Sequence, residues 1–302
     1  KIEGNHIRLK PPELVVDEIE ETLKKSKFRD FEFVDSVFNL PPSHAKGICE
    51  EIIRRNIKVN LGAAGLNPIG CDEELFTLMK KANFRWLIST PESGSEKMLS
   101  NLGKGFGTME LERYACLARR FKIPAIWSFL IGGPGEDMGT VSETLEFIEK
   151  YVKIPDLAYV TTGVRLYPDT KLAKIAMDEG IINSQDELIE PKFYFSKELS
   201  KVELRTKLHE FSRVHPNFIH SYETRNPVLS LASRMFHMTG ISHPYWRYAW
   251  LFNKVARLCH RPRRLDKSPH RRTGDPYIPL TDGSRIAVIG AGPAGTLFAK
   301  FL

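Results

Sequence analysis

The sequence predicts an α/β protein with parallel strands, most simply a partial barrel of the TIM type. Three observations predict this fold. Segments with helical and strand periodicity alternate from Pro11 to about Gly180, each repeat takes roughly 25 to 35 residues, and the strands are short and mostly apolar. An open doubly wound sheet satisfies the same pattern. In both folds the functional groups gather at the carboxyl ends of the strands.

The expected elements follow one another closely. The first helix begins at Pro11, where proline and nearby acidic residues suit a helix N-terminus. Apolar residues at helical spacing predict the later helices, and short apolar runs predict the strands. Helices are expected at 11–23, 43–56, 72–83, 108–121, 141–152 and 170–179, and strands at 31–35, 58–62, 85–89, 125–131 and 157–162. After Phe195 the strand rhythm is expected to end, with further helices at 203–214 and 228–239.

The composition, with 42% hydrophobic and 27% charged residues, is typical of a soluble globular protein. No apolar run approaches the roughly 18 residues that a transmembrane helix needs. The four cysteines are isolated, which argues against a disulfide scaffold and a zinc site and favours a reducing cytoplasm: Cys49, Cys71, Cys116 and Cys259.

Polar and glycine-rich segments follow one expected strand after another. Asp35 ends the first strand, Pro91–Ser95 follows the third, Gly132–Glu136 the fourth, and Thr161–Arg165 the fifth. Glycine at such places lets backbone groups approach a ligand closely. Each segment alone is explained as well by a turn, a helix cap or a surface ion pair. Their convergence on one rim predicts a ligand site.

These segments resemble the barrel of radical S-adenosylmethionine enzymes, and above all the subgroup that often carries an N-terminal cobalamin-binding domain. The resemblance covers about residues 11–195 and rests on 35–38, 91–95, 102–105, 129–136 and 165–170. It implies a partial (β/α) barrel with a 4Fe-4S cluster on a C-x-x-x-C-x-x-C loop. That cysteine triplet is missing here. We expect the sequence to begin just after the cluster loop; loss of the cluster in a degenerate homologue is the alternative.

The resemblance also implies contacts with S-adenosylmethionine. Gly132, Gly133 and Glu136 match the family segment that lies along the adenine and methionine moieties. Glu92 and Ser93 match the position that binds the ribose hydroxyls, since a carboxylate accepts from two adjacent hydroxyl groups.

Four other residues take roles from the same resemblance. Lys104 is placed to pair with the methionyl carboxylate, and Asp35 to accept from the methionyl ammonium or to face substrate. Arg165 and Pro168 follow the last recognisable strand, where adenine packs. No catalytic residue and no metal ligand is predicted within the chain.

The C-terminal part is basic, with fourteen Lys and Arg against four Asp and Glu from Glu203 to Arg272. The segment Arg257–Arg272 is interpreted as a solvated linker or as a surface for RNA or anionic membrane. The aromatic stretch His243–Arg257 is expected to pack against the barrel, with a membrane surface as the alternative. The histidines follow no metal-ligand spacing: His209, His215, His220, His237 and His243.

The C-terminal residues predict the start of a second domain. The strand Arg285–Ile289 leads into Gly290-Ala-Gly292-Pro-Ala-Gly295 and a helical stretch from Thr296. In a dinucleotide-binding unit these glycines make the turn, allow close approach to a pyrophosphate and allow helix–strand packing, respectively. The motif resembles the start of FAD-dependent oxidoreductases more than that of NAD dehydrogenases, and we expect the sequence to be a fragment.

The expected organisation is a barrel over 1–195, a helical extension over 196–260, a basic linker over 261–283 and the start of an FAD- or NAD(P)-binding domain over 284–302. By the resemblance, the function is reductive cleavage of S-adenosylmethionine for methyl transfer or cyclisation on a small or lipid-like organic substrate. An electron donor, possible cobalamin and an FAD domain would complete the enzyme, and the fragment by itself would be inactive. The alternative is a non-catalytic barrel that docks RNA or membrane through its basic segment.

Overall fold

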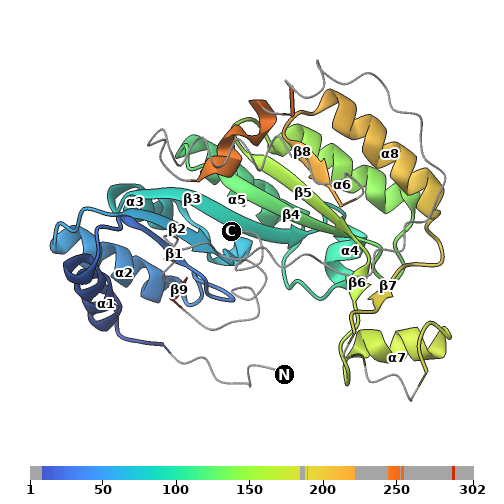
Figure 1. Ribbon diagram of the computed structural model, residues 1–302, viewed down its shortest axis with the longest axis horizontal. Helices are drawn as coiled ribbons and strands as arrows, with labels where there is room; N and C mark the ends of the chain where they lie inside the picture. The colour runs from blue at the N-terminus through green and yellow to red at the C-terminus, as the bar shows by residue number, and fades with distance from the viewer. Residues whose placement is uncertain are drawn as a thin grey trace.

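The computed structural model describes residues 9–183, 188, 190–221, 244–251, 253, 254, 288 and 289. Its centre is an open sheet of parallel strands in the order β8-β5-β4-β3-β2-β1-β9 (Figure 1). The two edge strands do not pair with each other, so the barrel is partial, and the predicted fold class is confirmed. The strands are β1 (Asp30–Phe33), β2 (Asn60–Ala64), β3 (Phe84–Glu92), β4 (Ala125–Ile131), β5 (Leu157–Thr162), β8 (Phe218–His220) and β9 (Val288–Ile289).

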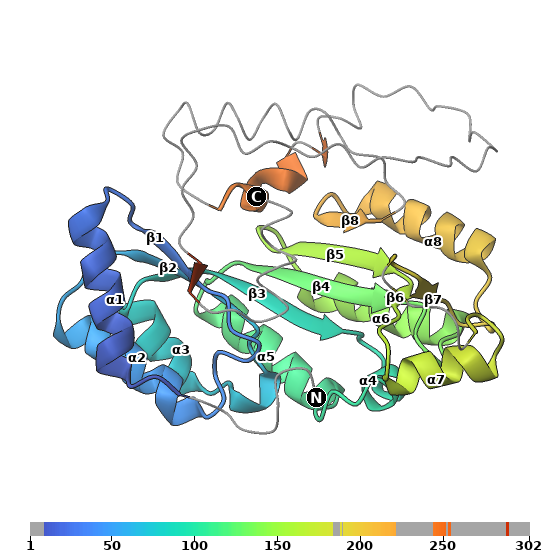
Figure 2. The same cartoon turned by 60° about the horizontal axis from the view of Figure 1, so that its bottom comes forward.

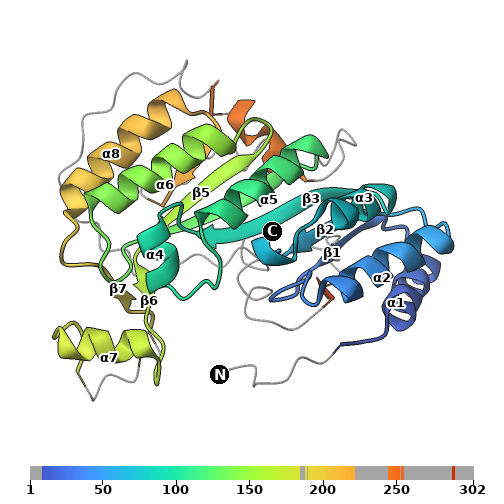
Figure 3. The ribbon, with the colours of Figure 1, turned by 180° about the vertical axis from the view of Figure 1, so that it is seen from behind.

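The long described helices cover one face of this sheet (Figures 2 and 3). A doubly wound sheet would carry helices on both faces, so the structure decides against that alternative for the residues it describes. Side-chain caps fix several helix starts; the Asp72 carboxylate, for example, accepts the Leu75 N–H. The helices are α1 (Pro12–Lys25), α2 (Pro42–Arg54), α3 (Glu73–Lys81), α5 (Thr108–Arg120), α6 (Met138–Tyr151) and α8 (Lys201–Val214).

The predicted helices and strands that fall within the described residues are present, with ends within three residues of those expected. One expectation is wrong, because the strand rhythm does not end at Phe195. After α8 the chain forms β8, which pairs in parallel with β5 and adds a sixth helix-backed strand to the sheet. Three residues are too short for a periodic signal, so only tertiary pairing reveals this strand.

Three smaller features were also not predicted. The helix α4 (Glu96–Asn101) and the short 3-10 helix η1 (Pro68–Gly70) lie within loops. Between β5 and α8 the chain makes an excursion, described at residues 163–183, 188 and 190–195, which projects from the body (Figure 1). It pairs β6 (Val164–Arg165) antiparallel with β7 (Phe193–Tyr194), and it carries α7 (Lys171–Asp178), the helix that was expected at 170–179.

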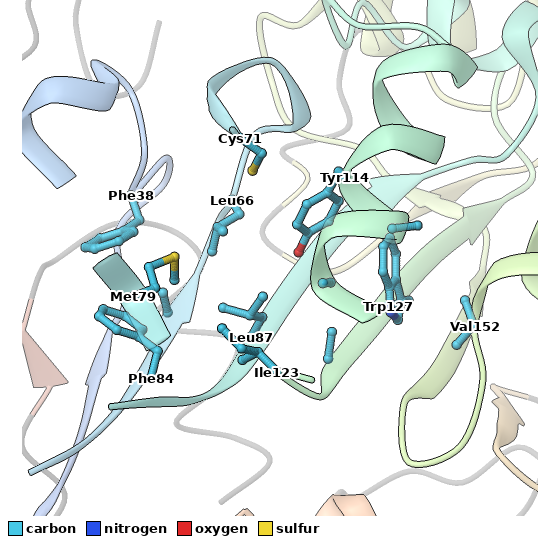
Figure 4. Packing of buried hydrophobic residues seen from close by; sticks show 14 of the residues in the cluster. Phe38, Leu66, Cys71, Met79, Phe84, Leu87, Tyr114, Ile123, Trp127 and Val152 are labelled. Atoms are coloured by element: carbon cyan, nitrogen blue, oxygen red, sulfur yellow. The ribbon is translucent and has the colours of Figure 1, made fainter. Parts of the chain in front are cut away.

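The main core lies between the sheet and the helix layer (Figure 4). The ring of Tyr114 in α5 packs against Trp127 in β4, with centroids 5.1 Å apart, and Trp127 lies 6.2 Å from Phe147 in α6. The indole N–H of Trp127 donates to Asp156 at 3.1 Å. Such tilted aromatic pairs join helices to strands by dispersion and by ring electrostatics.

Only some of the predictions for the C-terminal part fall on residues that the structure describes. The segment Pro244–Lys254 contains η2 (Tyr245–Tyr248) and lies on the sheet face opposite the helices (Figure 2). Asn253 in it donates to the Pro216 carbonyl at 3.0 Å. Val288 and Ile289 form a strand as predicted, but it pairs with β1 of the main sheet. The predicted helix 228–239, the linker, Cys259 and the three glycines Gly290, Gly292 and Gly295 lie outside the described residues.

No described helix is both long enough and apolar enough to cross a membrane.

The place of β8 in the core gives a stability prediction. Phe218 is fully buried, and its ring meets that of Phe211 in α8 edge-on at 4.8 Å. Phe218→Ala is expected to lower the free energy of unfolding by about 3–5 kcal/mol, measured by urea denaturation. Phe193, with 55% of its surface exposed, provides the control, and Phe193→Ala should cost little. Equal effects of the two substitutions would contradict the assignment of β8 to the core.

Candidate functional site

The last residue of β3 is the most unusual point of the sheet rim. Glu92 adopts φ +69°, in the left-handed region that few residues other than glycine enter. It pairs across the sheet with Phe129 of β4 after a register shift that begins at Ser89. Residues kept in such conformations concentrate at ligand sites, where the surrounding structure holds them. Glu92 thus combines a left-handed backbone with a place at the end of a sheet strand.

Lys104 lies beside Glu92, on the loop that joins α4 to α5. Its Nζ is 3.2 Å from Glu92 Oε1 and donates to the Thr90 carbonyl at 3.2 Å. Gly103 and Gly105 on either side adopt φ +66° and +73°, which a larger residue would resist. The loop thus directs a lysine onto the end of β3, where it neutralises the carboxylate.

A pocket of about 410 Å³ opens along the same loop. That volume is in the range of small-molecule sites. Of the residues predicted to bind S-adenosylmethionine it contains Lys104 alone. The other lining residues come from η1, α4, the loop and α5: Ile69, Glu96, Leu99, Ser100, Gly103, Gly105, Phe106, Gly107 and Glu110.

The loop after β4 is built around a buried carboxylate. Glu136 is fully buried, and its Oε2 accepts the N–H groups of Gly132 at 2.5 Å and Gly133 at 2.9 Å. Ser196 holds the same loop from outside, donating its N–H to the Gly132 carbonyl at 3.0 Å and its hydroxyl to the Glu136 carbonyl at 2.8 Å. Gly132 itself has φ +114°. Glu136 therefore shapes the glycine loop, since its carboxylate is used within it.

Burial raises the pKa of Glu136 to about 7, against the opposing effect of the two glycine N–H groups. Its Oε1 has no hydrogen-bond partner among the described residues.

Ser93, also at the end of β3, has its side chain directed into the protein. Its side chain is buried, and its hydroxyl lies 2.9 Å from the hydroxyl of Thr144 in α6 and accepts the Ser95 N–H at 3.1 Å. A Cβ on Gly94 would come within 2.5 Å of Phe147 Cβ, so α6 packs tightly here. Ser93 thus fastens the end of β3 to the helix layer, and its ribose contact stays a prediction.

The other predicted residues lie at different parts of the same edge. Asp35 is exposed just after β1, at the carboxyl edge that all the parallel strands share. Arg165 in β6 and Pro168 after it are exposed on the excursion, and the Arg165 guanidinium lies 4.9 Å from the Tyr167 ring centroid. The structure therefore brings Glu92, Lys104 and the glycine loop to neighbouring strand ends.

Two residues that hold this site were missed. Thr144 and Ser196 lie 51 and 60 residues along the chain from Ser93 and Glu136, respectively. No local motif marks them, because their role appears only when α6 and the segment after β7 pack on the strand ends.

Among the described residues no group of three or more His, Cys, Asp or Glu side chains could hold a metal ion. Cys49 and Cys71 are buried and Cys116 is exposed, and none forms a disulfide. Burial raises the pKa of the Cys49 thiol to about 12, so this thiol stays protonated.

No family model matches the sequence. The sequence is 24% identical over 200 residues to a Pyrococcus horikoshii protein named as an uncharacterized methyltransferase. The aligned region covers 63% of this chain and 42% of that protein. The fold is similar to that of the radical S-adenosylmethionine methyltransferase TsrM from Kitasatospora setae, whose structure contains cobalamin and a [4Fe-4S] cluster. The TM-score is 0.64 at 21% identity, over 81% of this chain and 54% of TsrM.

A second TsrM structure, with tryptophan substrate and a SAM analogue, gives the same TM-score of 0.64 at 19% identity. The relative and the neighbour are both methyltransferases. The chain spans about half the length of each, and at these identities the structural likeness establishes the fold: a partial (β/α) barrel of the kind found in radical S-adenosylmethionine enzymes.

Proposed function

We propose that this chain is the S-adenosylmethionine-binding core of a radical S-adenosylmethionine enzyme. The observation that carries the proposal is the arrangement at two neighbouring strand ends. At β3, Glu92 has a left-handed backbone and an ion pair with Lys104; at β4, Glu136 shapes a glycine loop. The likeness in fold to TsrM and the methyltransferase relative support the same function.

Each of these groups has a chemical role in the proposal. Glu92 Oε1 pairs with Lys104, which leaves Oε2 to accept from the ribose hydroxyls. The loop at Gly132 and Gly133 offers a surface without side chains, on which a flat adenine ring packs. Lys104 and the exposed Asp35 supply opposite charges for the methionyl carboxylate and ammonium, with Asp35 also able to face substrate. Arg165 and Pro168, which lie on the excursion between β5 and α8, would contact the adenine from that side.

A 4Fe-4S cluster does not fit the described residues, since their three cysteines lie apart and no cluster of metal ligands exists among them. The described residues are therefore assigned no cluster ligand in this proposal. The roles assigned here are therefore limited to binding and orienting S-adenosylmethionine.

The reaction of the whole protein follows from its relatives only as a proposal. Methyl transfer to a small or lipid-like organic substrate fits the two methyltransferases, and TsrM contains cobalamin. The glycine set Gly290, Gly292 and Gly295 supports a flavin- or nicotinamide-binding unit on the sequence motif alone. Flavin absorbance in the longer protein would test that unit. The alternative of an RNA- or membrane-docking module rests on Arg257–Arg272, outside the described residues, and the methyltransferase likenesses do not favour it.

The role of Glu92 is tested by the affinity of the protein for S-adenosylhomocysteine, the molecule that S-adenosylmethionine becomes after losing its methyl group. Glu92→Gln keeps the size of the side chain but removes the charge that strengthens its hydrogen bonds. It should weaken binding of S-adenosylhomocysteine by about 1–2 kcal/mol, measured by isothermal titration calorimetry. Glu143, on α6, gives the matched control Glu143→Gln with unchanged affinity. Unchanged affinity in Glu92→Gln would remove the ribose role, and no binding to the unmodified protein would contradict the proposed function.

The role of Glu136 is tested by the pH dependence of stability. Its folded pKa of about 7 lies above the ordinary value of 4.5, so the unfolded chain loses this proton first as the pH rises. The stabilisation is complete below pH 4.5 and is lost towards pH 7, a fall of about 3 kcal/mol. The free energy of unfolding, measured by urea denaturation at pH 4.5 and at pH 7, should show that fall when the unmodified protein is compared with Glu136→Gln. A difference that is constant with pH would show that the pKa of Glu136 is the same in the folded and the unfolded chain.

A further inference from the structure

A row of three residues crosses the sheet on the side away from the helices. Glu32 in β1 pairs in register with Gly62 in β2, and Gly62 with Trp86 in β3. The Trp86 indole N–H reaches across the middle strand and donates to Glu32 Oε2 at 2.5 Å. The two flanking strands are thus tied together over the glycine.

A β-bulge turns Trp86 to this face. Leu61 pairs with Phe84 but Gly62 pairs with Trp86, so Arg85 is an extra residue in β3. Phe84 and Leu87 belong to the core that packs with the helices, whereas Trp86, although only 5% exposed, does not. Bulges commonly re-aim a side chain beside a functional site. Without this one, strict alternation would place Trp86 on the helix side with Phe84.

The glycine is required for the same arrangement. A Cβ on Gly62 would lie 1.9 Å from Trp86 Nε1 and 2.0 Å from Cε2. No side chain fits in that space, so the indole rests directly on the backbone of β2. A bulge, a glycine and a short hydrogen bond therefore combine to hold the Glu32 carboxylate in one position.

Among the strand residues, Glu32 lies in an otherwise uncharged part of this face; the segment 244–254 on the same face carries Arg247 and Lys254 (Figure 2). Alternation along β4 and β5 turns the following residues to the same side: Ile126, Ser128, Leu130, Leu157, Tyr159 and Thr161. Asp30, at the exposed start of β1, is bonded to Asn60, and Arg85 is exposed in the bulge. Glu32 has no ion pair with any described residue, and burial raises its pKa. Glu32 is half-buried, and a carboxylate removed from water in this way is ordinarily paired with a cation, which no described residue supplies here.

The distance of Glu32 from the rim of the sheet matches the length of a small molecule. It precedes Asp35, at the rim, by three residues, which is about 10 Å along a strand. A molecule that reached Glu32 from the rim would place its other end near the strand ends where S-adenosylmethionine is proposed to bind.

We propose that Glu32 and Trp86 form a subsite for the protonated amine of the substrate, an organic amine whose remaining part is uncharged and largely apolar. The ammonium group binds the Glu32 carboxylate, the Trp86 ring lies beside it, and the apolar part lies against β4 and β5. This inference rests on the proposed function only in taking the reacting end of the substrate to lie at the rim.

The test compares phenethylamine with 2-phenylethanol, two probes of the same size that differ in charge. Titration of the 302-residue protein is followed by the indole N–H resonance of Trp86 in 15N NMR, which Trp86→Phe identifies among the four tryptophans. We expect phenethylamine to bind about ten-fold more tightly than the alcohol, and Glu32→Gln to abolish that preference. The amide oxygen that Glu32→Gln introduces would still accept the indole N–H, so the fold should persist.

The control is Glu50→Gln, on the exposed outer side of α2, which should keep the preference. If Glu32→Gln does not fold, Glu32→Asp replaces it and should keep a reduced preference, because it retains the charge. Equal affinities for the two probes in the unmodified protein, or an undiminished preference in either Glu32 variant, would overturn the proposal. Titration with S-adenosylhomocysteine separates the two hypotheses: an amine preference without cofactor binding contradicts only the proposed function, and the reverse contradicts only the amine subsite.

Discussion

The pairing of β3 with its two neighbours is the constraint on which both proposed sites depend. β3 carries one extra residue against β2 and another irregularity against β4, at different heights along the strand. The lower irregularity turns Trp86 to the face opposite the layer of long helices, and the upper one precedes the left-handed backbone of Glu92. A strand without these two shifts would alternate regularly from Phe84 to the rim. Its position in the middle of the sheet allows the shifts, because hydrogen bonds on both sides hold the rest of the strand in place.

Three glutamates illustrate how the same side chain acquires different properties from its surroundings. Glu92 lies at the rim with a lysine beside it, Glu136 is enclosed with two glycine N–H groups, and Glu32 meets only an indole N–H. Burial raises the pKa of the last two, and neither has a cation in contact within the described residues. A carboxylate with a cationic neighbour is suited to accept hydrogen bonds from neutral hydroxyl groups. A carboxylate without such a neighbour attracts a cation.

The glycine loop and the helix layer depend on each other. Glu136 and Ser196 hold the loop from within and from outside, and Ser93 with Thr144 ties the neighbouring strand end to α6. These contacts use buried polar groups that would be costly to leave unpaired. The packing of α6 and of the segment after β7 therefore holds the rim in one shape.

The sequence by itself determined the alternation of helices and strands, the parallel sheet and the position of the polar segments at the strand ends. These follow from local periodicity and from the rule that parallel strands end on one edge. It also indicated Glu92, Lys104 and the loop at Gly132, through a family resemblance. Tertiary structure alone decided that the helices lie on one face, that β8 extends the sheet, that Ser93 turns inward, and that Glu136 serves the loop. It alone joined Glu32 to Trp86 across 54 residues. The physical reason is that register shifts and side-chain hydrogen bonds between distant strands depend on how the strands pair, which no local pattern encodes.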